Sequence, residues 1–115
     1  MHRLRFLLLL TALVGVASGC TGRREREDAL KQDLRMMREA IDRFTFEKDQ
    51  APQSLQELVN GHYLEKIPDD PFTGKKDWVP YVSEPLTIGQ VHAGIADVHS
   101  NSDDVGSDGN PYNTW

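Results

Sequence analysis

The sequence of 115 residues contains a single cysteine, Cys20. One cysteine cannot form a disulfide within the chain, and its spacing from the histidines is not that of a zinc finger. The chain also lacks a nucleophile elbow and a glycine-rich phosphate loop. Its length suffices for one small domain and leaves little volume for an enclosed ligand pocket. These absences favour a non-enzymatic protein, and a hydrolase is the least favoured class.

Basic side chains are fewer than acidic ones, with 13 Lys and Arg against 18 Asp and Glu and a formal net charge of -5. Arg3 and Arg5 precede Cys20, whereas every acidic residue follows it, so a chain that begins at Cys20 carries a net charge of -7. Because nucleic-acid phosphates attract cations, this balance argues against nucleic-acid binding. The same balance suits a metal cation held by carboxylates.

Long apolar runs are absent except at the N-terminus, where residues 6–17 form one stretch. A membrane-spanning helix needs about 20 apolar residues, so this stretch is too short to span a bilayer comfortably. A short basic segment precedes it, and Ala17, Ser18 and Gly19 lead directly into Cys20. This order resembles the signal of bacterial lipoproteins, in which a peptidase cuts before a cysteine that carries lipid on its sulfur and amine. We therefore expect residues 1–19 to be a signal peptide and Cys20 to be a lipid anchor.

The alternative is an ordinary secretory signal followed by a buried free cysteine. Ala17 stands where the lipoprotein signal usually has leucine, but the polar residues 21–28 are unsuited to a core around Cys20. Thr21 at the second mature position, rather than aspartate, resembles an outer-membrane sorting signal of a host with two membranes. We expect residues 20–27 to form the anchor and a charged tether. The chain is then held at the bacterial cell envelope, facing the periplasm.

From Asp28 to Lys48 the sequence predicts an amphipathic helix. Its apolar stripe recurs at steps of four and three residues: Leu30, Leu34, Met37, Ile41 and Phe44. Met36, Ala40 and Phe46 are expected to widen this stripe, and the opposite face carries charged residues that include Arg35 and Arg38. The stripe covers about two heptads, fewer than the three or four typical of a coiled coil. Packing on its own domain is therefore favoured over a seam with another chain.

A capping box predicts a short second helix after this one. Ser54 is followed three residues later by Glu57, and Asn60-Gly61 ends the pattern. Asp69 and Asp70 in the proline-containing connector are expected to cap a turn rather than to form an acid–base pair. Thr73-Gly74-Lys75 predicts a further turn.

Two β-strands are expected, over Trp78–Val82 and Val91–Val98, joined by a loop through Glu84–Gln90. Alternation about Ile95 predicts that one face of the second strand is buried. Pro80 makes the first strand an edge strand or an irregular one. The expected fold class is α+β, with the long helix packed on a small antiparallel sheet and followed by a C-terminal loop.

Two stretches, APQSLQELVNGHYLEKIPDDPFTGK and IADVHSNSDDVGSDGNPYNTW, follow the long helix in that order. Together they resemble the major pseudopilin of type II secretion systems, over residues 28–115. The resemblance implies a pilin-like domain and a structural or accessory role in a secretion or type IV pilus-like system. It also implies other pseudopilins or secretion-system proteins as partners.

The chain departs from that family at its N-terminus. A pseudopilin begins with a prepilin-peptidase site and a long apolar helix that forms the fibre core, whereas here TGRREREDALKQ follows Cys20. Lipoprotein processing would discard the only apolar stretch. We therefore expect a lipid-tethered pilin-like accessory rather than a fibre subunit. The alternative is a lipid-anchored ligand-binding protein of the envelope.

Three aspartates, Asp103, Asp104 and Asp108, lie within six residues of the C-terminal segment. Calcium takes about six to eight oxygen ligands, which a short loop can supply from carboxylates, amides and carbonyls. The spacing is not that of an EF-hand, and the alternative is a solvated acidic loop. Because nearby carboxylates repel one another, a bound cation would order the loop.

The pseudopilin resemblance implies one calcium ion between two aspartates of this loop. Carried over by position, these are Asp104 and Asp108, and Asp103 could replace Asp104. Ser100 and Asn101 are further candidate ligands. With calcium bound, the aromatic C-terminus is expected to cover an edge of the sheet.

Overall fold

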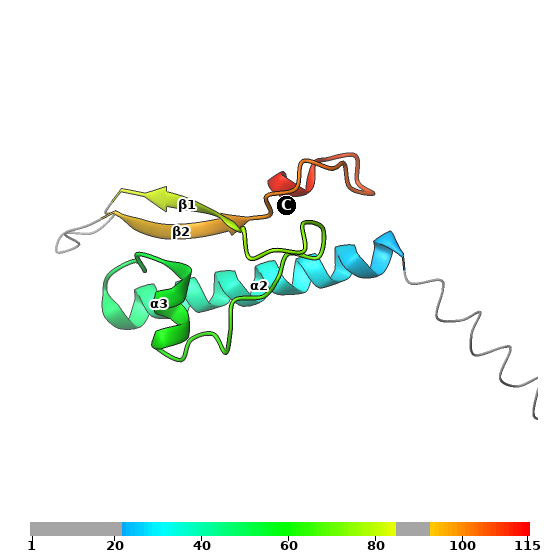
Figure 1. The fold of residues 1–115 in the computed structure, drawn as a ribbon. Helices are drawn as coiled ribbons and strands as arrows, with labels where there is room; N and C mark the ends of the chain where they lie inside the picture. The colour runs from blue at the N-terminus through cyan, green and yellow to red at the C-terminus, as the bar shows by residue number, and fades with distance from the viewer. Residues whose placement is uncertain (1–21, 85–92) are drawn as a thin grey trace, which may run out of the picture.

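The computed structural model describes residues 22–84 and 93–115. Along the chain these form α2 (Arg23–Lys48), α3 (Leu55–Asn60), β1 (Val79–Ser83), β2 (Gly94–His99) and the 3-10 helix η2 (Tyr112–Thr114). In Figure 1 the two strands lie over α2, α3 lies beside its C-terminal half, and the C-terminal segment lies over its N-terminal half. The expected α+β architecture, a long helix packed on a small antiparallel sheet, is confirmed. The expected signal peptide, Cys20 and the loop over residues 85–90 lie outside the described residues, as does the start of the second expected strand.

Helix α2 buries the predicted apolar stripe. Its five members are each at most 5% exposed: Leu30, Leu34, Met37, Ile41 and Phe44. Ala40 is buried beside them, but Met36 is 42% exposed and Phe46 is 85% exposed, so the expectation that these two widen the stripe is wrong. A helix that packs on one sheet buries only one face. Met36 and Phe46 are each rotated by over ~100° about the helix axis from the centre of the stripe, so their side chains point to solvent.

Helix α2 begins at Arg23, five residues before the predicted start. Residues 23–27, expected to belong to the tether, are therefore helical, and Glu27 is only 4% exposed. Residues 23–26 remain exposed, and the C-terminal segment binds this part of the helix through Arg23 and Glu27. Among the helices of residues 22–84 and 93–115, none has the length and hydropathy needed to cross a membrane.

Local signals are confirmed in the segment that follows. The Ser54 hydroxyl accepts a hydrogen bond from the Glu57 amide at 3.2 Å and so caps α3. The Asp70 carboxylate accepts the Phe72 amide at 2.8 Å, as expected of a turn-capping group. Gly74 has a φ of 71°, the left-handed conformation that glycine adopts without strain.

The two strands pair antiparallel, with Val79 opposite His99 and Ser83 opposite Gly94. The predicted alternation in the second strand fails, since Ile95 and Val98 are both buried although they are three residues apart. A register shift explains this, because β2 has one extra residue, Ala96, between its pairings with β1. An extra residue moves the alternation by one position, so Ile95 and Val98 can share the face toward the core.

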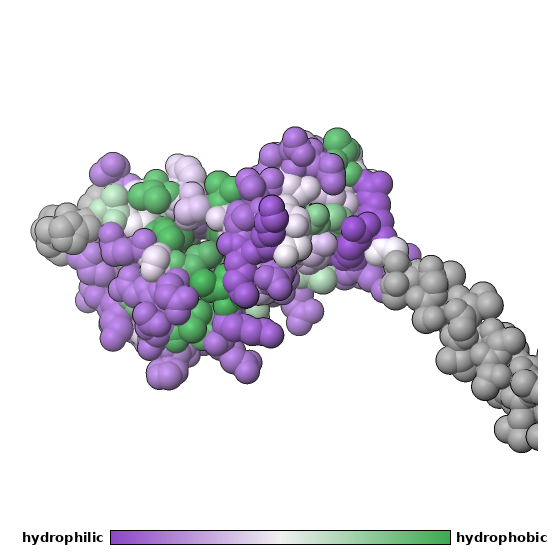
Figure 2. All heavy atoms as spheres, viewed as in Figure 1, coloured by the Kyte–Doolittle hydropathy of each residue, from purple (hydrophilic) through white to green (hydrophobic). Residues whose placement is uncertain are grey.

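Strand β2 packs against α2, whereas β1 forms the outer side of the sheet and makes no contact with α2. Leu58, Leu64, Trp78 and Tyr112 complete the core. The Trp78 indole, expected within the first strand, instead lies just before it and donates to the Pro68 carbonyl at 2.7 Å. Figure 2 shows hydrophobic atoms gathered between the sheet and the helices below it, bordered by polar side chains.

Candidate functional site

The C-terminal segment forms a compact loop over the first turns of α2 (Figure 1). Val105 and Pro111 form an antiparallel bridge, and inside it the Gly106 amide donates to the Asn110 carbonyl at 2.8 Å. The Tyr112 amide donates to the Asp104 carbonyl at 2.9 Å. Much of the loop's polar backbone is therefore paired within the loop, which defines its conformation.

The Glu27 carboxylate is the point at which this loop is attached to α2. It accepts hydrogen bonds from the Ser107 amide at 3.0 Å, from the Ser107 hydroxyl at 2.5 Å and from the Tyr112 hydroxyl at 2.8 Å. The bond from the Ser107 side chain is the main cause that lowers the pKa of Glu27, and burial opposes it. With the Tyr112 and Ser107 amide bonds and the nearby Arg23 charge, the pKa falls from 4.5 to about 2. Glu27 is therefore a carboxylate at neutral pH.

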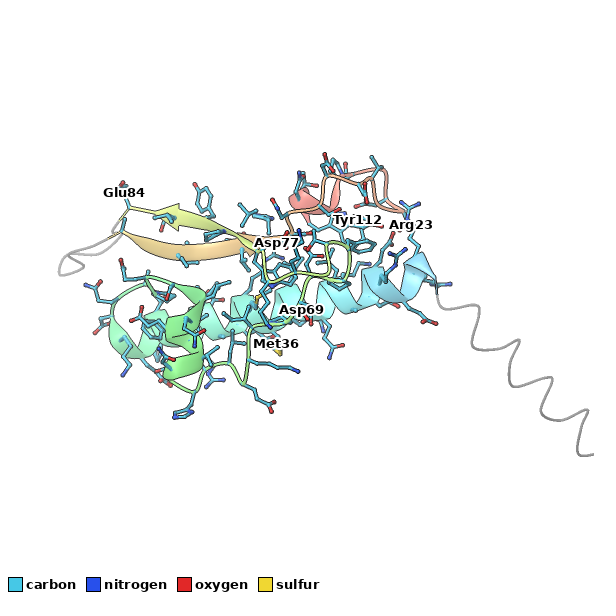
Figure 3. All side chains as sticks on the ribbon, viewed as in Figure 1. Arg23, Met36, Asp69, Asp77, Glu84 and Tyr112 are labelled. Atoms are coloured by element: carbon cyan, nitrogen blue, oxygen red, sulfur yellow. The ribbon has the colours of Figure 1, made fainter. Side chains whose placement is uncertain are left out.

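Arg23, one helical turn before Glu27, completes the attachment. Its Nε donates to the Tyr112 hydroxyl at 3.1 Å and lies 3.3 Å from Glu27 Oε1, and its Nη2 donates to the Val105 carbonyl. In Figure 3 the labelled Arg23 and Tyr112 side chains lie next to each other at the start of α2. We call these four residues the loop clamp: Arg23, Glu27, Ser107 and Tyr112.

Aromatic packing reinforces the clamp. The Tyr112 ring stacks on Phe72 with centroids 3.8 Å apart and meets Trp115 edge-on at 5.0 Å. Arg26 lies over the Phe72 ring and Lys31 over the Trp115 ring, each 5.2 Å from the centroid. The aromatic C-terminus therefore packs on Phe72 and on α2, and η2 also contacts β2, whereas the prediction had placed it on an edge of the sheet with calcium bound.

A second polar cluster joins α2, β2 and the chain's last residue. Arg38, expected on the solvent face, donates to Asp97 at 2.7 Å, to the Val98 carbonyl at 3.0 Å and to the Trp115 carbonyl at 2.7 Å. The His99 ring lies between two acceptors, the Trp115 oxygen at 2.8 Å and Asp97 at 3.3 Å. This cluster holds the far end of the C-terminal segment in place.

Two of the five predicted calcium ligands have side chains bonded elsewhere. The Ser100 hydroxyl is fully buried and donates to Asp70 at 2.5 Å. The Asn101 amide donates to Asp77 at 3.2 Å. Both side chains thus bond to aspartates of the turn over residues 70–77, Ser100 through its hydroxyl and Asn101 through its amide nitrogen.

Asp103, Asp104 and Asp108 are all exposed. The Asn110 amide donates to Asp108 at 2.9 Å and is the main cause that lowers the pKa of Asp108. Within residues 22–84 and 93–115, no three His, Cys, Asp or Glu side chains gather closely enough to hold a metal ion.

The loop clamp was missed by the sequence interpretation, although one signal pointed to it. Glu27 lies three residues before Leu30 and seven before Leu34, so the buried stripe extends back to it. A carboxylate on a buried face requires hydrogen-bond partners. Those partners, Ser107 and Tyr112, come from the opposite end of the chain.

Comparison of the chain with protein-family models, with curated proteins and with solved structures gives no match. The likeness to the major pseudopilins therefore rests on the two sequence stretches and the order of elements described above.

Proposed function

We propose that this chain is a lipid-anchored, pilin-like structural component or accessory of a type II secretion or type IV pilus-like system, without enzymatic activity. The observation that supports this most is the arrangement of the long helix, the sheet and the C-terminal segment. A 26-residue amphipathic helix packs along β2, and the aromatic C-terminus returns to the N-terminal half of that helix. This order is the one that the pseudopilin resemblance implies.

The charged sequence that follows Cys20 favours an accessory role over a fibre subunit, because the resemblance places a long apolar helix in the fibre core. Leu30, Leu34 and Ile41 are buried in the chain's own core, so the stripe is not available as a seam for neighbouring helices. Only Thr21 and Gly22 separate Cys20 from the first residue of α2. A lipid on Cys20 would hold the folded domain close to the bilayer, with its charged helix face open to protein partners. Several acyl chains on one cysteine suffice for stable anchoring.

Calcium remains a prediction of the resemblance. The side chains that could hold it are the exposed carboxylates of Asp108 and of Asp104 or Asp103, with loop carbonyls as further oxygen ligands. A bound ion would supply a positive charge to the acidic loop. The Ser100 hydroxyl is buried and bonded to Asp70, whereas Asn101 bonds Asp77 through its amide nitrogen and keeps its Oδ1 oxygen as a candidate ligand.

Protein export in a strain that lacks the chain tests the proposed function. We expect less type II substrate in the medium, and restoration by the wild-type chain and by a Thr21→Ser control. A Cys20→Ser chain should fail to restore export and should leave the membrane fraction or accumulate as precursor. The intact mass of the membrane-extracted protein establishes whether Cys20 carries lipid. Normal export without the chain, together with no secretion-system protein cross-linked to it, would refute the proposal.

A further inference from the structure

The acidic loop lies against the positively charged end of α2. The first amides of a helix lack partners within the helix and give that end a partial positive charge. Arg23, Arg24 and Arg26 add three cations there, which the helix dipole alone would disfavour. Arg23, Arg26 and Asp104 line the same groove, which brings a loop carboxylate near two of these cations.

The hydrogen bonds of the clamp run directly between α2 and the C-terminal loop. Glu27 accepts three hydrogen bonds from the loop, and Arg23 donates to Tyr112 and Val105 while pairing with Glu27. Hydrogen bonds to charged groups are stronger than those between neutral groups. A buried donor that loses its acceptor lowers the free energy of unfolding. Every one of these atoms belongs to the chain itself.

We propose that Arg23, Glu27, Ser107 and Tyr112 fasten the C-terminal loop to α2 without a metal ion, so that the loop and the first two turns of the helix fold as one unit. Calcium, where it binds, then meets a loop that is already docked. Loss of Glu27 leaves the Ser107 amide and the Tyr112 hydroxyl without their acceptor and Arg23 without its counter-charge. The inference does not depend on the proposed role in secretion.

The test is amide hydrogen exchange of the peptide 101–115 in the full chain, held in detergent with excess chelator. Wild-type protein should protect this peptide in chelator. Glu27→Gln, which keeps the side-chain shape, should speed its exchange roughly tenfold or more. Glu25→Gln removes the same charge two residues earlier, at an exposed position, and should change exchange less than about twofold.

Tyr112→Phe gives an independent measurement from the loop side, because it removes two clamp bonds and keeps the stacked ring. We expect faster exchange of the same peptide, with α2 intact by circular dichroism, and this variant decides the matter if Glu27→Gln does not fold. Two results would overturn the proposal. One is a wild-type loop that exchanges at least tenfold faster in chelator than in millimolar calcium. The other is exchange in Glu27→Gln or Tyr112→Phe no faster than in Glu25→Gln.

Discussion

Replacement of Ile41 by alanine measures how much of the domain's stability comes from the helix–sheet contact. Ile41 is 1% exposed and belongs to the buried cluster that includes Ile95 and Val98 of β2. The substitution removes three carbon atoms and leaves a cavity that the rigid helix and sheet can fill only in part. Truncations of this kind cost about 2–5 kcal/mol of unfolding free energy. For a domain of this size, a loss of about 2–3 kcal/mol lowers Tm by roughly 10–20 °C.

Urea unfolding followed by far-UV circular dichroism gives this free energy directly, and an unchanged m-value shows that the same surface is exposed on unfolding. Phe46→Ala is the matched control on the same helix, since Phe46 is 85% exposed. We expect it to change stability by less than about 0.5 kcal/mol. Ile41→Val should fall between the two, at about 0.5–1.5 kcal/mol. An Ile41→Ala cost no greater than that of Phe46→Ala would show that the stripe is a seam for another chain rather than a core.

Three further outcomes follow from the loop and the sheet. Because the pKa of Glu27 falls from 4.5 to about 2 on folding, its stabilisation is complete above pH 4.5 and is lost as the pH falls through 2. The difference in urea midpoint between wild type and Glu27→Gln should therefore decrease as the pH falls from 4.5 to about 2. A difference that stays constant would contradict the lowered pKa of Glu27. A Cβ on Gly94 would come within 2.6 Å of the Ala51 Cβ and 2.9 Å of its carbonyl oxygen. Gly94→Ala should thus cost about 1–3 kcal/mol in urea unfolding, and Ala51→Gly should recover part of it. Calcium at about a hundredfold excess over Kd should stabilise the wild-type chain by about 2.7 kcal/mol in thermal melts, and the Asp108→Ala variant should not be stabilised. If neither calcium nor chelator changes Tm, the prediction of a metal site is wrong and the clamp proposal stands.

The sequence by itself determined the features whose causes lie within a few residues of one another. The steps of three and four from Leu30 to Phe44 identified the buried face of α2, because helical periodicity decides which side chains share a face. Ser54 and Glu57 identified the start of α3, and Gly74 the turn, because each acts on neighbouring backbone groups. The candidate acidic residues could be named in the same way, since their clustering is a matter of adjacent positions.

The tertiary structure alone decided the register of the sheet and the start of the long helix. The extra residue in β2 that brings Ile95 and Val98 to one face depends on pairing with β1, and no local pattern marks it. Helix α2 extends back to Arg23, where Arg23 and Glu27 bind a loop that the chain reaches only at its end. The composition of this segment predicted a tether, because a prediction from local sequence takes no account of partners that are distant in the chain.

The candidate site shows the same division. Sequence proximity grouped Ser100 and Asn101 with the aspartates, yet folding directs their side chains to Asp70 and Asp77. Glu27 and Ser107 are separated by 80 positions, and their side chains still make the shortest hydrogen bond among the four clamp residues. A hydrogen bond depends on the distance and direction between two atoms, and for residues this far apart in the chain only the packing of helix, sheet and loop sets both.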